Sequence, residues 1–346
     1  MKLFHYAIRN LISLMLLVFF VALLLLDVYR FEVWPQILDF PHQNFSLESI
    51  YSHPHGVRYL LILPALLISD FLNIQDSLVF SLYVFLIMLL AIFCLQKLLV
   101  EELPNKPLGV LFLVVFFVVI FLNMNGRMAF SLAGASIQIY VLYHWGSLRN
   151  IKKISLMILS LFLCSVSSGT FLLIFLIYSF FIFKNSVFVT GVLTRTDALF
   201  LVFMFIVVAI SPIIFMFIFK NLSYFGGGLS GLYNMLGHGF GSLFIEEAGW
   251  GLIVYILVCF LSFAFFCYVS AIYKGFSFAP WFFVLTIFGG LFGYSTATIA
   301  LPLYLVVMAR IISRVTLRGF VLKVNSAASS SKCNAIEVCS GRRRIS

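Results

Sequence analysis

The chain has 346 residues, of which 63% are hydrophobic and only 10% are charged, and its formal net charge is +10. A soluble domain carries roughly a quarter charged residues, so this composition excludes an ordinary soluble protein. Apolar runs of membrane-spanning length recur from Leu11 to Ile312 and predict an all-α, polytopic integral membrane protein. The positive charge is concentrated after Arg310, which is typical of a cytoplasmic flank and does not indicate a partner nucleic acid.

The apolar runs predict about 10–11 transmembrane helices. Ten of them are expected near 8–26, 77–96, 107–123, 129–145, 154–167, 169–183, 198–219, 248–271, 281–296 and 298–313. The eleventh candidate is RYLLILPALLISDFLN, residues 58–73, which begins with Arg58, contains Pro64 and has Asp70 near its end. We interpret this run as a re-entrant or interfacial helix.

Basic residues decide the orientation, because cytoplasmic loops carry an excess of Lys and Arg. If 58–73 does not cross, the basic turn GSLRNIKK (146–153) is cytoplasmic, as are both termini. The loops 27–57 and 220–247, in which acids outnumber bases, are then external. Residues 1–313 form one membrane domain in this scheme. Residues 314–346 form a basic tail that we expect to be disordered and cytoplasmic.

The external loop before 58–73 ends in YSHPHGVRYLL, which brings His53, His55 and Arg58 close together in sequence. Three interpretations stay open: an ordinary interfacial loop, a loop that contacts substrate or transfers a proton, and a metal site. No nearby carboxylate completes a tetrahedral ligand set, so no metal is predicted. Histidine serves as a general base near neutral pH, and Glu48 in the same loop is a second candidate.

Arg127 lies between two apolar runs, in FLNMNGRMAFSLAG (121–134). One interpretation is that its side chain reaches the interface and fixes topology. The other is that its planar guanidinium binds phosphate on a lipid substrate at the external leaflet. Asn125 beside it could add a hydrogen bond to the same ligand.

The second large external loop, 220–247, contains a run of glycines with His238 and Glu246 among them. It is not a phosphate-binding P-loop, because no GK[ST] follows the glycines. The interpretations are a flexible loop and a lid over an external cavity, with His238 and Glu246 as polar contacts. No GxSxG, DxD or CxxC motif occurs, so neither a cofactor nor a nucleotide-dependent transferase is indicated.

The segment from Asn125 to Phe181 resembles the central part of the Wzy-type and EpsG-like polysaccharide polymerases. The shared pattern is an arginine that opens a helix with small residues, a basic cytoplasmic turn, and a helix with polar residues midway. Its parts are Arg127, then Ala129, Ala133 and Ala135, then Arg149 to Lys153, then Ser165, Ser167 and Ser168. The chain departs from the family at Met128, where the family often has glutamine, and it lacks the family's histidine near Ser165.

The resemblance implies polymerisation of undecaprenyl-diphosphate-linked oligosaccharide repeat units into O-antigen or capsule at the outer face of the bacterial inner membrane. Arg127 and Arg58, with Asn125, would hold the lipid diphosphate. A base among His53, His55, His238, Glu48 and Asp39 would deprotonate the acceptor hydroxyl. The implied partners are membrane lipids, a flippase and a chain-length regulator. No cofactor is required, because the energy is held in the diphosphate linkage.

Two other functions remain open. A transporter or flippase would show paired broken helices near the midplane, and GGLFGYSTATIALP (289–302) and SVSSGT (165–170) are candidates. Another polyprenyl-dependent membrane transferase would favour an acidic pair early in the chain, which is not evident.

Overall fold

The structure is a computed structural model that describes a subset of the chain. The described residues are 18–26, 31, 56–100, 111, 114–115, 126–184, 211–212, 215, 218–219, 222–245, 249–293, 296 and 298–312. Within these ranges the side chains of 56, 57, 99, 100, 168, 183, 184 and 274 are not described. The external loop 27–57 apart from 31 and 56–57, the tail 314–346, and most of the expected spans 107–123 and 198–219 lie outside the description.

All regular structure in the described residues is helical, which confirms the predicted all-α class for this part of the chain. The labelled α-helices are α4 (Gly56–Leu72), α5 (Asp76–Val100), α7 (Gly126–Tyr143), α8 (Asn150–Cys164), α9 (Ser168–Lys184), α12 (Gly228–Leu236), α13 (Ser242–Ile245), α14 (Trp250–Ile272) and α15 (Ala279–Gly290). Two short 3-10 helices, η1 (Lys274–Phe276) and η2 (Thr298–Ala300), join them. The second opens the final helix, Thr298–Ile312.

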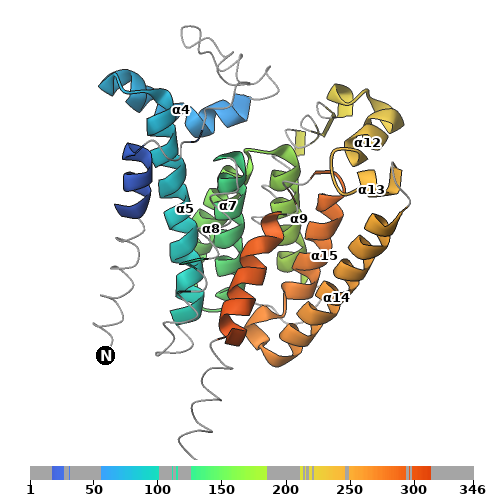
Figure 1. Ribbon diagram of the computed structural model, residues 1–346. Helices are drawn as coiled ribbons and strands as arrows, with labels where there is room; N and C mark the ends of the chain where they lie inside the picture. Colours follow the sequence, from blue (N-terminus) through green and yellow to red (C-terminus); the bar gives the residue numbers. More distant parts are fainter. Residues whose placement is uncertain are drawn as a thin grey trace, which may run out of the picture.

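The long helices form a bundle, with α4 lying across its upper end in Figure 1. Along the bundle α5 packs on α4 and α7, α7 on α8, α8 on α9, α9 on α15, and α15 on α14. The short helices α12 and α13 lie at the same upper end as α4 (Figure 1). The upper end therefore combines segments that are far apart in the sequence.

Helix α7 lies at the centre of this bundle, with every residue from Ala129 to Leu142 buried. Small residues allow a close approach to α8. The Ser160 hydroxyl donates to the Gly134 carbonyl across the crossing, at 2.8 Å. A Cβ on Gly134 would clash with the Cys164 sulfur and lie 2.8 Å from the Ser160 carbonyl oxygen. Glycine is therefore required at this crossing for steric reasons.

Two described helices are long and apolar enough to cross a membrane, Asp76–Leu98 in α5 and Trp250–Ile272 in α14. Three shorter apolar helices accompany them, Gly169–Ile182, Ala279–Gly290 and Thr298–Ile312. A buried core helix of a soluble protein passes the same test, but only 11% of the α14 window is buried. A long exposed apolar helix favours association with a membrane. The expected ten or eleven crossings stay a prediction.

The run 58–73 is helical as expected, and α4 continues through Pro64. A tight turn then connects it to α5: Asn73 has φ 52°, and the Ser69 hydroxyl donates to Asp76 Oδ1 at 2.6 Å. The Tyr83 hydroxyl donates to the Leu61 carbonyl at 2.9 Å and fixes α5 against α4. These contacts keep α4 at the end of the bundle.

The basic turn between α7 and α8 lies at the opposite, lower end, because α7 runs down from Gly126 and α8 runs back up. There Lys153 packs over the Trp145 ring, with 4.9 Å from Nζ to the ring centroid. Arg310 of the final helix donates to the Tyr143 hydroxyl at 3.2 Å. Among the described segments, the turn 146–153 and Arg310 thus lie at one end of the bundle, and α4 and α12 lie at the other.

Candidate functional site

Arg127 is the second residue of α7, at the upper end of the bundle. The helix start is packed tightly, since a Cβ on Gly126 would lie 3.1 Å from the Phe80 ring. The side chain of Arg127 is partly buried at this helix start. Arg127 Nε is buried and has no hydrogen-bond partner among the described residues. Burial lowers the pKa of Arg127 from its usual value, as expected when a charge loses contact with water.

Arg58 lies on the first turn of α4. Its Nε donates to the Val166 carbonyl at 2.8 Å, in the turn between α8 and α9. The pKa of Arg58 is lowered to about 10, mainly by burial and in smaller part by the positive charge of Arg127. Arg58 therefore stays charged at neutral pH. Arg58 on α4 and Arg127 on α7 thus lie within electrostatic range of each other.

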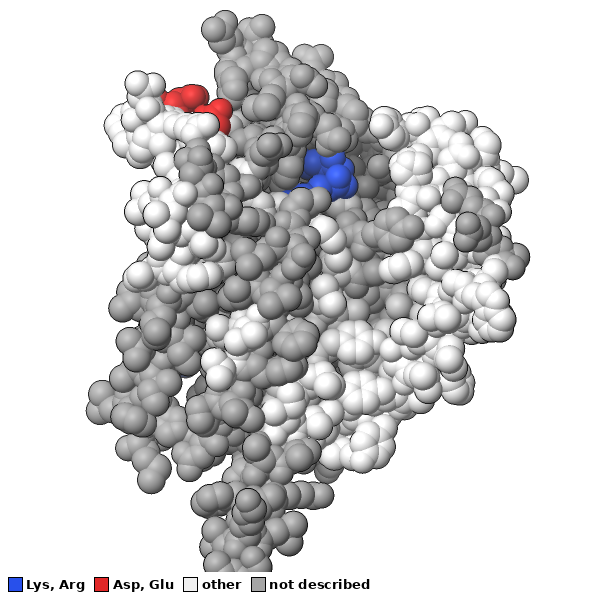
Figure 2. Space-filling model, in the orientation of Figure 1, with Lys and Arg blue, Asp and Glu red and all other residues white. Residues whose placement is uncertain are grey.

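Arg127 Nε is buried without a described hydrogen-bond partner, and a half-buried guanidinium group needs an anion or solvent beside it. Asp70 and Asp76 are the acidic side chains within the described part of the chain. Asp76 already accepts from Ser69. Figure 2 shows a basic patch in a recess in the upper half of this face, and the described acidic side chains lie apart from it. This arrangement favours an anion-binding recess, which we call the arginine recess (Arg58, Arg127 and the Val166 carbonyl).

Tyr224 lies within electrostatic range of Arg58 and is a minor influence that opposes the lowering of the Arg58 pKa. It belongs to the glycine-rich segment that was expected to be a loop or a lid. The structure differs: three glycines with positive φ, Gly226 (111°), Gly227 (73°) and Gly228 (52°), turn the chain into helix α12. Only glycine adopts such a run at low cost. The apolar residues that follow then allow a helix where the glycines predicted irregular structure.

His238 lies just after α12, in a pocket of about 610 Å³ that we call the α12 pocket. Tyr224, Phe225, Gly226, Tyr233, Asn234, Gly237, His238 and Ile245 line it. His238 Nδ1 lies 2.9 Å from the Asn234 carbonyl oxygen. A carbonyl can only accept, so this hydrogen bond puts the proton on Nδ1 and leaves Nε2 as the basic nitrogen. A histidine oriented in this way can accept a proton from a hydroxyl.

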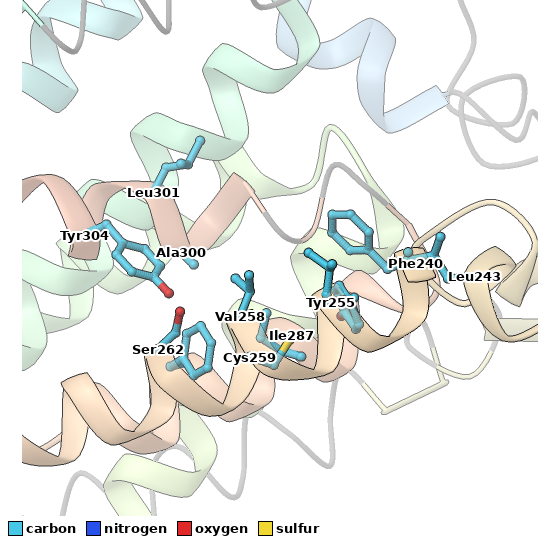
Figure 3. Close-up of a pocket in the computed structure, with 13 residues that line it drawn as sticks. Phe240, Leu243, Tyr255, Val258, Cys259, Ser262, Ile287, Ala300, Leu301 and Tyr304 are labelled. Atoms are coloured by element: carbon cyan, nitrogen blue, oxygen red, sulfur yellow. The ribbon is translucent and has the colours of Figure 1, made fainter. Parts of the chain in front are cut away.

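A second pocket of about 400 Å³ lies between α14, α15 and the final helix, and Figure 3 shows its lining. The lining side chains are mainly apolar, and the hydroxyls of Ser262 and Tyr304 point toward each other (Figure 3). Phe240 and Tyr255 close one end, with ring centroids 5.0 Å apart. This pocket can take a hydrocarbon chain, and it offers no charged group for chemistry.

The segment between the two pockets is bound to the upper end of α15. The Phe240 amide donates to the Gly290 carbonyl at 3.0 Å, and the Gly241 amide donates to the Leu291 carbonyl at 3.1 Å. A Cβ on Gly239 would lie 2.5 Å from the Gly290 carbonyl oxygen. Backbone thus meets backbone directly. Because of this contact, His238 on one side and Phe240 on the other are held in fixed positions.

The sequence-predicted site residues divide into two groups. Arg127, Arg58 and His238 lie at the upper end, and the structure brings the two arginines within electrostatic range of each other. His53, His55, Glu48 and Asn125 lie outside the described residues, as do Asp39 and Glu246. Among the described residues, no group of three His, Cys, Asp or Glu side chains gathers to hold a metal ion.

Sequence reasoning missed three contributors: Tyr224, Asn234 and the Val166 carbonyl. The polar run at Ser165 to Ser168 marked the right turn, but a backbone acceptor has no residue signature. The tyrosine was hidden in an aromatic-rich chain, where 18% of residues are Phe, Trp or Tyr.

No protein-family model matches this chain, and no curated protein and no solved structure matches it either.

Proposed function

We propose that this chain is a multi-pass membrane glycosyltransferase that polymerises oligosaccharide repeat units linked to undecaprenyl diphosphate, at the external face of a bacterial inner membrane. The observation that carries the proposal is the arginine recess. Two half-buried guanidinium groups from α4 and α7 lie within electrostatic range of each other there, and Arg127 Nε has no described hydrogen-bond partner. Arginine pairs suit diphosphate, because the planar fork makes two parallel hydrogen bonds to phosphate oxygens.

The reaction breaks the bond between the anomeric carbon of the growing glycan and the lipid diphosphate oxygen. A new bond forms from that carbon to an acceptor hydroxyl on the next lipid-linked repeat unit. The acceptor proton goes to a base, and the bonding electrons leave with the diphosphate. Negative charge therefore develops on the leaving group, where Arg58 and Arg127 stabilise it. Arg58 is held to the Val166 carbonyl and Arg127 Nε is buried at the start of α7, so little rearrangement is needed.

His238 is the base that the described residues favour. Its Nδ1 is tied to the Asn234 carbonyl, so Nε2 is available for the acceptor hydroxyl. It lies in the α12 pocket, at the same end of the bundle as α4 (Figure 1). Base and leaving-group site are thus at one end of the bundle. His53, His55, Glu48 and Asp39 remain candidates from the sequence, with Asn125 as a further ligand for the diphosphate.

The membrane topology belongs to the same proposal. With the upper end of the bundle outside, the lower end puts Arg149 and Lys152 in the cytoplasm, as the positive-inside rule expects. The apolar pocket of Figure 3 lies beside the mostly exposed α14 and could hold part of a polyprenyl chain. A flippase would deliver the substrate to this face, and a chain-length regulator would act on the product.

The test is a glycan ladder from a strain that lacks this gene, with the wild-type gene or a variant supplied back. We expect the deletion to leave a single repeat unit on its acceptor and the wild type to restore a ladder. Arg127→Ala and Arg58→Ala should restore only the single unit. Arg149→Ala is the matched control, because it removes an exposed arginine from the lower end.

The same gel separates the alternatives. Polymer loss without any single-repeat product would place the defect before polymerisation and favour a flippase or an earlier polyprenyl-dependent transferase. Full ladders from both arginine variants at normal protein levels would show that the arginine recess has no role in the reaction.

A further inference from the structure

The α12 pocket has a composition that suits a sugar ring. Aromatic side chains and hydrogen-bonding groups alternate around it, and the tyrosines are accessible: Tyr224 is 74% and Tyr233 57% exposed. A pyranose has one apolar face of C–H groups and a rim of hydroxyls. An aromatic ring covers such a face, while amide and imidazole groups bind the rim.

The polar groups of this pocket are held in place before any ligand arrives. The Asn234 side-chain amide donates to the Phe225 carbonyl at 2.8 Å, so its Oδ1 remains as an acceptor. Phe225 packs edge-on against His238, with ring centroids 4.6 Å apart. The Ser230 hydroxyl donates to the Gly227 carbonyl at 2.8 Å and secures the glycine turn. A preorganised site loses less entropy on binding.

The pocket volume of about 610 Å³ also fits a ring of this kind. Small-molecule sites in proteins measure about 300–1,000 Å³. The described residues of the lining include no Lys, Arg, Asp or Glu, so none of them offers a charge partner to a free phosphate or a charged peptide. A hydrocarbon chain would have to cover Asn234 and His238, which costs free energy when hydrogen bonds are lost.

We propose that the α12 pocket binds a neutral pyranose ring of the glycan, with Tyr233 as the stacking platform and Asn234 as a specificity-determining hydrogen-bond partner. This inference rests on the proposed function for the identity of the glycan, and on the geometry for the site. Helix α12 lies at the same end of the bundle as α4, which carries Arg58 (Figure 1). The ring bound here is therefore part of the glycan on the side of the bundle that holds the arginine recess.

The experiment measures sugar binding and phosphate binding separately on the purified full chain in lipid nanodiscs. Saturation-transfer NMR would use the methyl glycosides of glucose, galactose, rhamnose and N-acetylglucosamine. Titration calorimetry would use farnesyl diphosphate, which carries a lipid diphosphate and no sugar. We expect at least one glycoside to bind, with signal from the C–H face of its ring.

Variants then assign the site. Tyr233→Ala should weaken glycoside binding about fivefold, the size expected for loss of an aromatic contact. Tyr233→Phe keeps the ring and should retain binding. Leu229→Ala is the matched control, because Leu229 is exposed on the same helix and does not line the pocket. Farnesyl diphosphate binding should be unchanged in all three variants.

Each outcome has one meaning. Failure of every glycoside to bind, with farnesyl diphosphate still bound, would overturn the sugar site and leave the proposed function standing. Equal binding in Tyr233→Ala and wild type would also overturn it. If the wild-type protein bound neither the glycosides nor farnesyl diphosphate, the proposed function would be rejected together with the sugar site. Glycoside binding without farnesyl diphosphate binding would keep the sugar site and reject the arginine recess.

Discussion

At the scale of single residues, the central question is why Arg127 is placed at the start of the most buried helix. A lysine would keep the charge but lose the planar fork that matches two phosphate oxygens. It would also be a compact ammonium in a place shaped for a wider group. Replacing Arg127 with lysine therefore tests whether the shape of the guanidinium group matters in addition to its charge.

We expect Arg127→Lys to lower polymerisation about 100-fold, the effect of removing one well-placed stabilising donor from a transition state. The assay is the rate of ladder growth at matched protein levels. Arg149→Lys makes the same chemical change at the exposed lower end and should keep the wild-type rate. Normal growth in Arg127→Lys would leave this arginine as a topology anchor.

The pH dependence of anion binding follows from Arg58. Its pKa is lowered to about 10 by burial and by Arg127, so the unfolded chain holds this proton more tightly than the folded protein. The charge on Arg58 thus destabilises the folded protein at neutral pH. This destabilisation decreases as the pH rises above 10, because the folded protein then loses the proton. Anion binding depends on the same proton and runs the other way: it is present below pH 10 and is lost above it.

Farnesyl diphosphate binding should therefore be constant from pH 8 to 9 and weaken between pH 10 and 11. Phosphate esters are fully ionised above about pH 8, so the ligand contributes no titration there. Calorimetry over this range, with Arg58→Ala beside the wild type, measures the effect. A wild-type profile that stayed flat to pH 11 would show that the charge of Arg58 does not contribute to binding.

At the scale of helices and turns, the sequence predicted much of the framework and little of the site. The expected spans 77–96 and 248–271 correspond to α5 and α14, because long apolar runs are helical in any packing. Helices that are apolar all round give no preferred face, so nothing in the sequence showed that α4 and α7 bring Arg58 and Arg127 within electrostatic range of each other. Helix α12 was missed because glycines precede it and also lie within it, at Gly228 and Gly231.

The docking of residues 239–241 on α15 has no sequence signal beyond the glycines themselves. We expect Gly239→Ala to destabilise the protein by about 1–3 kcal/mol, the usual cost of overpacking, because the new Cβ would meet backbone atoms. Thermal unfolding in detergent measures the change. Gly249→Ala is the control, since a Cβ there has open space around it. Equal stability of the two variants would contradict the tight docking.

At the scale of the whole molecule, the bundle has two chemically different ends. The upper end holds the arginine recess and the α12 pocket, and the lower end holds the basic turn before α8. A membrane protein needs such polarity to act on one side only. The orientation can therefore be tested without knowledge of the substrate.

A single cysteine at Tyr233 should react with a membrane-impermeant thiol reagent added from outside, and one at Ile151 should not. Both side chains are well exposed, so accessibility differs only through the side of the membrane. The parent for both is a chain without its native cysteines. Labelling at Ile151 and protection at Tyr233 would reverse the proposed topology.

The contrast between the enclosed α7 and the open α14 has a consequence for how this sequence can change over time. On α14 one apolar residue can replace another at little cost in stability wherever the side chain contacts hydrocarbon. The sequence there can therefore change while its hydrophobicity is kept. Along α7 the small residues at the α8 crossing and the arginine at the helix start leave little freedom. Distant descendants of one ancestor would then share a spacing of small residues and one arginine, with little identity elsewhere.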